Sequence, residues 1–244
     1  MIDFSSIKAI FFDADDTLFE VKGSVGQQYA PHLKNHGYDI LADSIDRVIP
    51  EAWLQTIDSY ENRESEYTAN HTQDRREWRE FLYNVMSALE IYQPSEQLLE
   101  DIYDTFAEAH SRQLLPYIKQ TLTALRRHPI TLGVLTNNDN RIHRLIPALG
   151  LGDYFHHIFC ASDLGYRKPS HRVFSRIAEH LQLLPQEILY IGDCPRNDVA
   201  GALNAQWNAL WLKRGASQLR RDTPLNSAQS VPHISCYSEL LRHL

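Results

Sequence analysis

Two aspartates separated by one residue, Asp13 and Asp15, follow a short apolar run near the start of the chain. A carboxylate in such a position can act as a nucleophile, as a general acid or base, or as a ligand for a hard metal ion. Other polar residues follow later apolar runs in the same way, namely Thr136, Asn137, Lys168, Asp193 and Asp198. Grouped carboxylates resist ionisation unless a cation neutralises them, so this set of oxygen donors favours Mg²⁺.

A calcium-binding EF-hand loop is the alternative interpretation of the first aspartates. Asp13, Asp15 and Thr17 would occupy the first, third and fifth positions of such a loop. The sixth position is then Leu18 rather than glycine, and the twelfth is Ser24 rather than glutamate. The spacing therefore argues against an EF-hand.

The elements that must position these residues alternate along the chain. Five nearly continuous apolar runs are typical of strands covered on both faces of a parallel sheet, and they span residues 7–13, 130–137, 157–163, 188–193 and 208–212. Helical spacing of apolar residues is found at 119–128, 141–149, 170–181, 198–205 and 237–244. This alternation predicts an α/β fold with a doubly wound parallel sheet. Because ligands bind at the carboxyl edge of such a sheet, we expect the polar residues to converge there.

A long insertion separates the first two predicted strands, and it far exceeds the length of a simple crossover. Its apolar residues have helical spacing at 25–36, 45–61, 75–89 and 97–114. We therefore predict a catalytic core of residues 1–19 and 115–244, with residues 20–114 forming a helical cap. The most polar stretch, residues 61–76, is expected to be mobile or solvated.

Composition excludes several classes of protein. The 244 residues are 43% hydrophobic and 23% charged, which is ordinary for a globular protein of one domain with an insertion. The net charge is −7, and residues 20–115 hold 18 acidic residues against 8 basic ones. We therefore expect no nucleic-acid partner. No apolar run reaches the length of a membrane-spanning helix, so we expect no membrane association.

The cysteines and histidines give no metal motif. Cys160, Cys194 and Cys236 are far apart, which predicts neither a disulfide framework nor a CxxC zinc site. The 12 histidines include no HExxH pattern, and we expect structural or surface roles for them. Since the first residues lack the features of a signal peptide, we expect a cytoplasmic protein.

The polar motifs, taken together, resemble those of the haloacid dehalogenase superfamily of aspartate-nucleophile hydrolases. The family motif DxDx[TV] is matched at residues 13–17, its strand-ending Thr or Ser by Thr136, its Lys-Pro by Lys168-Pro169, and its GDxxxND at residues 192–198. The resemblance covers residues 1–19 and 115–244, and it implies a Rossmannoid core. The helical insertion resembles the C1-type cap of the family.

The resemblance implies roles for the aspartates. Asp13 would attack phosphorus and form an aspartyl-phosphate, which divides one difficult displacement into two. Asp15 would protonate the leaving oxygen and then activate water as a general base. The carboxylates of Asp13 and Asp193 and the backbone carbonyl of Asp15 would bind Mg²⁺.

The same resemblance implies roles around the phosphoryl group. Thr136, Asn137 and Lys168 would contact that group, and Lys168 would also pair with Asp13. Asp198 would lie behind these residues and orient either a metal-bound water or Lys168.

The resulting prediction is an Mg²⁺-dependent phosphatase that acts on a small phosphomonoester, such as a nucleoside monophosphate or a sugar phosphate. Dehalogenases of the family lack an acid at the position of Asp15, so the residue favours phosphoryl transfer. Two alternatives stay open, a phosphomutase of the same family and a catalytically idle binding protein with the same fold. The sequence leaves the oligomeric state undetermined.

Overall fold

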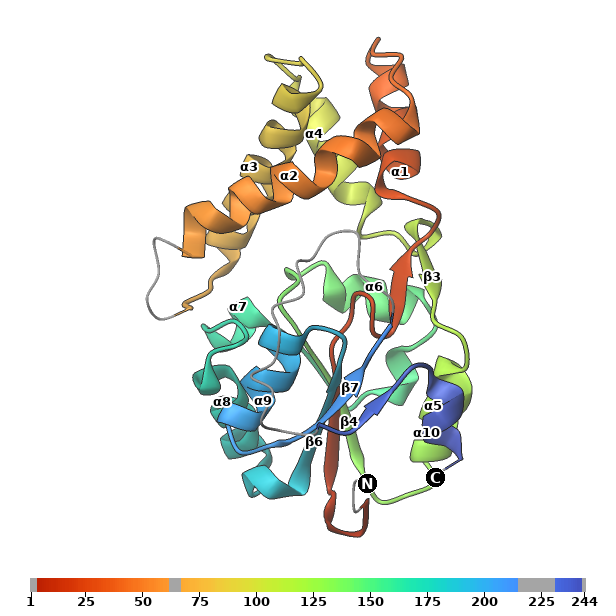
Figure 1. Ribbon diagram of the computed structural model, residues 1–244, viewed down its shortest axis with the longest axis vertical. Helices are drawn as coiled ribbons and strands as arrows, with labels where there is room; N and C mark the ends of the chain where they lie inside the picture. Colours follow the sequence, from red (N-terminus) through yellow and green to blue (C-terminus); the bar gives the residue numbers. More distant parts are fainter. Residues whose placement is uncertain (1–3, 62–66, 215–230, 243–244) are drawn as a thin grey trace.

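The computed structural model describes residues 4–61, 67–214 and 231–242. Its main sheet contains six parallel strands in the order β5-β4-β1-β6-β7-β8 (Figure 1). The strands are β1 (Ala9–Phe12), β4 (Thr131–Thr136), β5 (His157–Cys160), β6 (Ile188–Gly192), β7 (Asn208–Leu212) and β8 (His233–Ile234). The five predicted strands are therefore present, and β8 is an additional edge strand.

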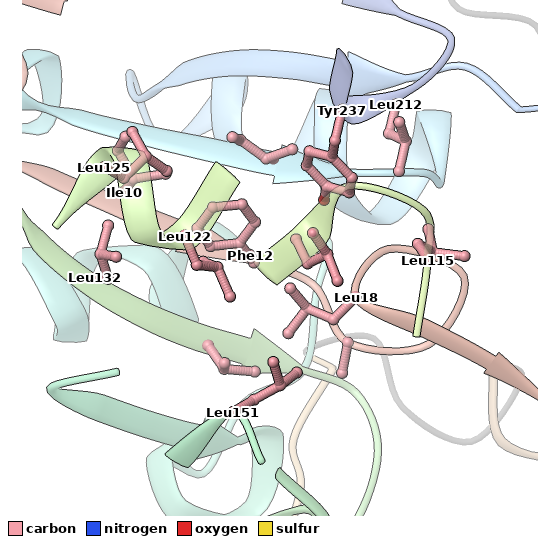
Figure 2. Packing of buried hydrophobic residues seen from close by; sticks show 14 of the residues in the cluster. Ile10, Phe12, Leu18, Leu115, Leu122, Leu125, Leu132, Leu151, Leu212 and Tyr237 are labelled. Atoms are coloured by element: carbon pink, nitrogen blue, oxygen red, sulfur yellow. The ribbon is translucent and has the colours of Figure 1, made fainter. Parts of the chain in front are cut away.

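Helices cover both faces of this sheet, because successive side chains of a strand point to opposite sides. On β1, Ile10 and Phe12 join one hydrophobic cluster, whereas Ala9 and Phe11 join another. The first cluster, shown in part in Figure 2, includes residues of α5 (Ile118–Leu125), α6 (Ile142–Ala148) and α10 (Tyr237–Leu241). The second includes residues of α8 (His171–Leu181) and α9 (Gly201–Asn204). The predicted doubly wound α/β fold is confirmed.

The long insertion forms a helical layer with its own hydrophobic cluster. It contains α1 (Val25–Asn35), α2 (Ala42–Glu61), α3 (His71–Ala88) and α4 (Glu96–Thr105), which lie above the sheet in the view of Figure 1. The chain enters and leaves this layer through an antiparallel ribbon of β2 (Phe19–Val21) and β3 (Arg112–Leu114). This ribbon begins at Phe19 and ends at Leu114, and the predicted division into core and cap stays a prediction.

The prediction of a helix over residues 97–114 is wrong at its carboxyl end. Helix α4 ends at Thr105, and a short 3₁₀ helix (Ala109–Ser111) leads into β3. Pairing across the ribbon places Leu114 opposite Phe19 and Arg112 opposite Val21. Tertiary pairing thus determines a local structure that the helical spacing does not show.

Two other predicted segments also differ from the structure. The strand predicted over 157–163 ends at Cys160, where α7 (Ala161–Leu164) begins. The helix predicted over 198–205 is a π-helix (Pro195–Ala200) followed by α9. Short 3₁₀ helices complete the described elements at Phe4–Ser6, Gly152–Tyr154 and Pro185–Glu187. No helix among the described residues is both long and apolar enough to cross a bilayer.

Residues 67–76 of the polar stretch 61–76 include the start of α3, whereas residues 62–66 lie outside the described residues. Helix α3 begins at His71 because the side chain of Asn70 accepts a hydrogen bond from the backbone of Gln73 at 2.9 Å. Gln73 and Asp74 are buried in the first turns of the helix. Their burial reflects contact with the core, which the local polarity does not reveal.

The contact between α3 and the core is polar. The backbone of Ala69 donates to Gly165 at 3.1 Å, and that of Arg167 donates to Tyr67 at 2.8 Å. The Arg167 guanidinium forms two hydrogen bonds with Glu77, at 3.0 and 3.2 Å. The hydroxyl of Ser162 donates to the carboxylate of Asp74. The start of α3 is therefore held against the core.

Burial raises the pKa of Asp74 to about 6, although the Ser162 hydrogen bond and the Arg167 charge oppose the shift. The folded protein consequently binds more protons at this site than the unfolded chain does, so the contribution of Asp74 to the free energy of unfolding falls as pH rises from about 4 to about 6. We predict that Asp74→Asn, which carries no proton to lose, removes about 1–3 kcal/mol of this pH dependence. Urea unfolding across this pH range measures the effect.

The control for this experiment is Asp104→Asn, because Asp104 is an exposed aspartate of the same helical layer. Its free energy of unfolding should change with pH between about 4 and 6 in the same way as that of the wild type. If the free energy of unfolding of Asp74→Asn also changed with pH as that of the wild type does, burial of the Asp74 charge would contribute nothing to the pH dependence of stability.

Candidate active site

A buried lysine connects three segments of the site. Lys168, in the loop between α7 and α8, has its Nζ atom 2.7 Å from each of Asp13 Oδ1, Asp198 Oδ1 and Tyr190 Oη. Asp13 directly follows β1, Tyr190 lies within β6, and Asp198 lies in the π-helix after β6. Three parts of the chain distant in sequence thus meet at one ammonium group.

The ammonium group remains charged in this position. Burial lowers the pKa of Lys168, but the charges of Asp13 and Asp198 outweigh that effect, and the net shift is upward. Asp13 and Asp198 are also almost fully buried, at 4% and 1% exposure. Because the three charged groups are desolvated together, their interaction is stronger than that of an exposed ion pair.

The hydroxyl group of Tyr190 forms the third contact of the lysine. It accepts from Lys168 and donates to the backbone carbonyl of Leu135 at 2.6 Å. Burial raises the pKa of Tyr190 well above its ordinary value, and the Asp198 and Asp13 charges raise it further. The neutral hydroxyl therefore joins the lysine to β4.

Asn137 holds the backbone of the lysine. Its side-chain oxygen accepts from the Lys168 backbone at 2.8 Å, and its side-chain nitrogen donates to the Lys168 carbonyl at 2.9 Å. Both ends of the amide thus position Lys168. The predicted contact between Asn137 and a substrate stays a prediction.

Asp15 lies in a different environment from Asp13. Its Oδ2 atom accepts a hydrogen bond from Asn138 Nδ2 at 2.7 Å, and its Oδ1 atom is 3.6 Å from Arg112 Nη2. Asn138 in turn donates its backbone N–H to Thr136 Oγ1 at 3.1 Å. The Asp15 side chain is 31% exposed. It is thus oriented by neighbours while remaining accessible.

Asp13, Asp193 and Asp198 form an acidic group in which one oxygen from each lies within 4.8 Å of the others. Asp198 already accepts from Lys168 and, at 2.8 Å, from the backbone of Cys194. A Cβ atom on Gly192 would lie only 2.4 Å from Asp198 Oδ2, so glycine allows this close approach. The group could bind a metal, and its oxygen donors suit a hard divalent cation. The carboxylate of Asp15 is not part of it.

Two residues of the site were not recognised in the sequence. Tyr190 lies in the buried strand β6, and the sequence indicates its role only by placing a hydroxyl group within an apolar run. Arg112 lay inside a predicted helix and gave no signal. Its guanidinium is buried over the rings of Phe106 and Phe19, and its Nε atom has no hydrogen-bond partner among the residues that the structure describes. Burial lowers the Arg112 pKa even though the Asp15 charge opposes the shift.

With the fold and the site described, similarity to known proteins identifies the family. The sequence profile of the haloacid dehalogenase-like hydrolases matches residues 7–206. The chain therefore belongs to the haloacid dehalogenase-like hydrolase family, as the resemblance of its motifs implies.

Individual proteins with similar sequences or structures include the following. The haloacid dehalogenase-like hydrolase domain-containing protein 3 of Bos taurus is 24% identical over 199 residues, covering 80% of this chain and 78% of the relative. A glyceraldehyde 3-phosphate phosphatase of Methanopyrus kandleri is 27% identical over 223 residues, covering 87% and 86%. The structure of the L-2-haloacid dehalogenase from Xanthobacter autotrophicus is similar with a TM-score of 0.67 at 18% identity, covering 97% of both chains. This last likeness shows a shared fold.

The Tyr190 hydroxyl provides a test of the buried network. We predict that Tyr190→Phe lowers the free energy of unfolding by about 1–3 kcal/mol, because it removes one of the three contacts of the buried Lys168 ammonium group and a hydrogen bond to the Leu135 carbonyl. Urea unfolding measures the loss. Tyr92→Phe is the matched control, since Tyr92 is 76% exposed. Equal stability of the two variants would mean that the hydroxyl contributes nothing to the network.

Proposed function

We propose that this protein is an Mg²⁺-dependent phosphatase that hydrolyses a small phosphomonoester through an aspartyl-phosphate on Asp13. The observation that carries this proposal is the buried contact between Asp13 Oδ1 and Lys168 Nζ, at 2.7 Å. A carboxylate held in this way at the carboxyl edge of the sheet is a positioned nucleophile.

In the first step, the second oxygen of Asp13 attacks phosphorus while the bond from phosphorus to the leaving oxygen breaks. Lys168 holds the nucleophile and supplies positive charge next to the transferring group. Thr136, which is 2% exposed at the end of β4, contributes its hydroxyl to the phosphoryl group. Mg²⁺ bound by Asp13, Asp193 and the Asp15 carbonyl would neutralise charge between the nucleophile and the anionic substrate.

Asp15 supplies the proton that this step needs. Its carboxyl group protonates the leaving oxygen as the bond to phosphorus breaks, and the resulting carboxylate then takes a proton from the attacking water. The hydrogen bond from Asn138 fixes the direction of this carboxyl group. Water attack on the aspartyl-phosphate releases phosphate and restores Asp13.

The acid at position 15 also supports phosphoryl transfer over dehalogenation. An alkoxide is a poor leaving group and needs a proton, whereas a halide leaves without one. Relatives named as glyceraldehyde 3-phosphate phosphatases match 87% and 96% of this chain and agree with this proposal. We further propose that residues 20–114 act as a cap that selects the substrate and limits the access of water.

The nucleophile is tested by Asp13→Asn. We predict that phosphate release from a panel of phosphomonoesters requires added Mg²⁺ and falls by at least about 10³-fold in this variant, because an amide cannot form the acyl phosphate. The control Asp153→Asn replaces an exposed aspartate remote from the site and should retain full activity. Release that persists in Asp13→Asn would refute the proposal, and phosphosugar isomerisation without net release would favour a phosphomutase.

The acid is tested by changing the leaving group. We predict that Asp15→Asn lowers kcat/KM for an alkyl phosphate by about 10²–10⁴-fold. The loss should be much smaller with p-nitrophenyl phosphate, whose leaving group needs no proton. Steady-state kinetics on both substrates provides the comparison. Equal losses on the two substrates would contradict the assignment of Asp15 as the general acid.

A further inference from the structure

A second cluster of possible metal ligands lies where helix α3 of the insertion contacts the core. Asp163, in α7, has its Oδ2 atom 2.9 Å from His143 Nε2 and its Oδ1 atom 3.6 Å from His71 Nε2. Cys160 ends β5 immediately before α7. One donor atom from each of His71, Cys160 and Asp163 lies within 4.8 Å of the others.

The donors of this cluster differ from those of the acidic group around Asp13. His71, Cys160 and Asp163 supply one imidazole nitrogen, one sulfur and one carboxylate, and His143 adds a second imidazole through its contact with Asp163. Together these four residues make a ligand set that zinc binds with four-fold coordination. Zinc–ligand bonds of about 2.0–2.3 Å in a tetrahedron place the ligand atoms about 3.3–3.8 Å apart. The distance of 3.6 Å between His71 and Asp163 already lies in this range. His143 Nε2 and Asp163 Oδ2 are 2.9 Å apart, so these two atoms must separate by about 0.4 Å or more for both to bind the ion.

The surroundings also suit an ion that enters from solvent. The His71, His143 and Asp163 side chains are 51%, 42% and 24% exposed, whereas Cys160 is buried beneath them. The backbone N–H of Cys160 donates to Asp163 Oδ2 at 2.8 Å and fixes the carboxylate. Such a hydrogen bond to a ligand orients it for binding.

We propose that His71, His143, Cys160 and Asp163 form a binding site for a divalent ion of the zinc type. When the ion binds, the thiol proton of Cys160 passes to the buffer and the thiolate becomes a ligand. His71 is the first residue of α3, whereas the other three ligands belong to the core. The ion therefore fastens the helical insertion to the core, independently of the proposed phosphatase activity.

Cobalt is the probe for this site, because a cobalt–thiolate bond gives a charge-transfer absorption that oxygen and nitrogen ligands do not produce. The titration uses the full chain with excess Mg²⁺, so that the acidic group does not compete for Co²⁺. The expected result is one equivalent of Co²⁺ bound with the thiolate band. The band should persist in Cys194→Ser and Cys236→Ser and disappear in Cys160→Ser. Its absence in the wild type, or its persistence in Cys160→Ser, would overturn the proposal.

Two histidine variants keep the test valid if Cys160→Ser fails to fold. His71→Gln and His143→Gln alter exposed side chains, and each should weaken Co²⁺ binding by at least about 10-fold. His128→Gln, at an exposed histidine outside the cluster, should bind as the wild type does. Zinc added to the wild type should also raise the unfolding temperature, and this rise should be reduced in His71→Gln. Unchanged cobalt affinity in both His71→Gln and His143→Gln would refute the site.

Discussion

The ammonium group of Lys168, enclosed between two buried carboxylates, is the interaction on which this site depends. It lies 2.7 Å from Asp13 and from Asp198, and each of these residues comes from a different segment. Burying one of these charges alone would cost several kcal/mol, so each is tolerable only with the others. The network therefore requires the strands that bring these segments to one edge of the sheet. In return, it fixes the orientation of Asp13.

The surrounding strands, helices and polar side chains hold Lys168 and its carboxylate partners in place. Two hydrophobic clusters hold the sheet between helical layers, so that β1, β4 and β6 end together. Asn137 fixes the lysine backbone from the end of β4, and Tyr190 joins its ammonium group to the same strand. Asp15, beyond the end of β1, is more exposed and has different partners. The two aspartates thus occupy environments that suit different chemical roles.

Much of this arrangement can be predicted from sequence because it depends on short-range pattern. Buried parallel strands have nearly continuous apolar sequences. The polar residues at their carboxyl ends must therefore lie along one edge of the sheet. The pairing of Lys168 with Asp13 follows from the family resemblance. The features that were missed arise from long-range contacts. Arg112 becomes part of a strand through pairing with Val21, and Asp74 is buried through contact with Ser162. Neither contact leaves a local pattern in the sequence.

The central claim is that Asp13 carries the phosphoryl group during turnover. It is tested most directly by acid-quenching a reaction of Asp15→Asn with p-nitrophenyl phosphate and Mg²⁺, followed by mass spectrometry of the peptides. Because the leaving group needs no acid while the second step lacks its base, the phosphoenzyme should accumulate. We expect one equivalent of p-nitrophenol in a burst and one phosphoryl group on Asp13. Release of p-nitrophenol with the phosphoryl group on another residue, or on none, would contradict it.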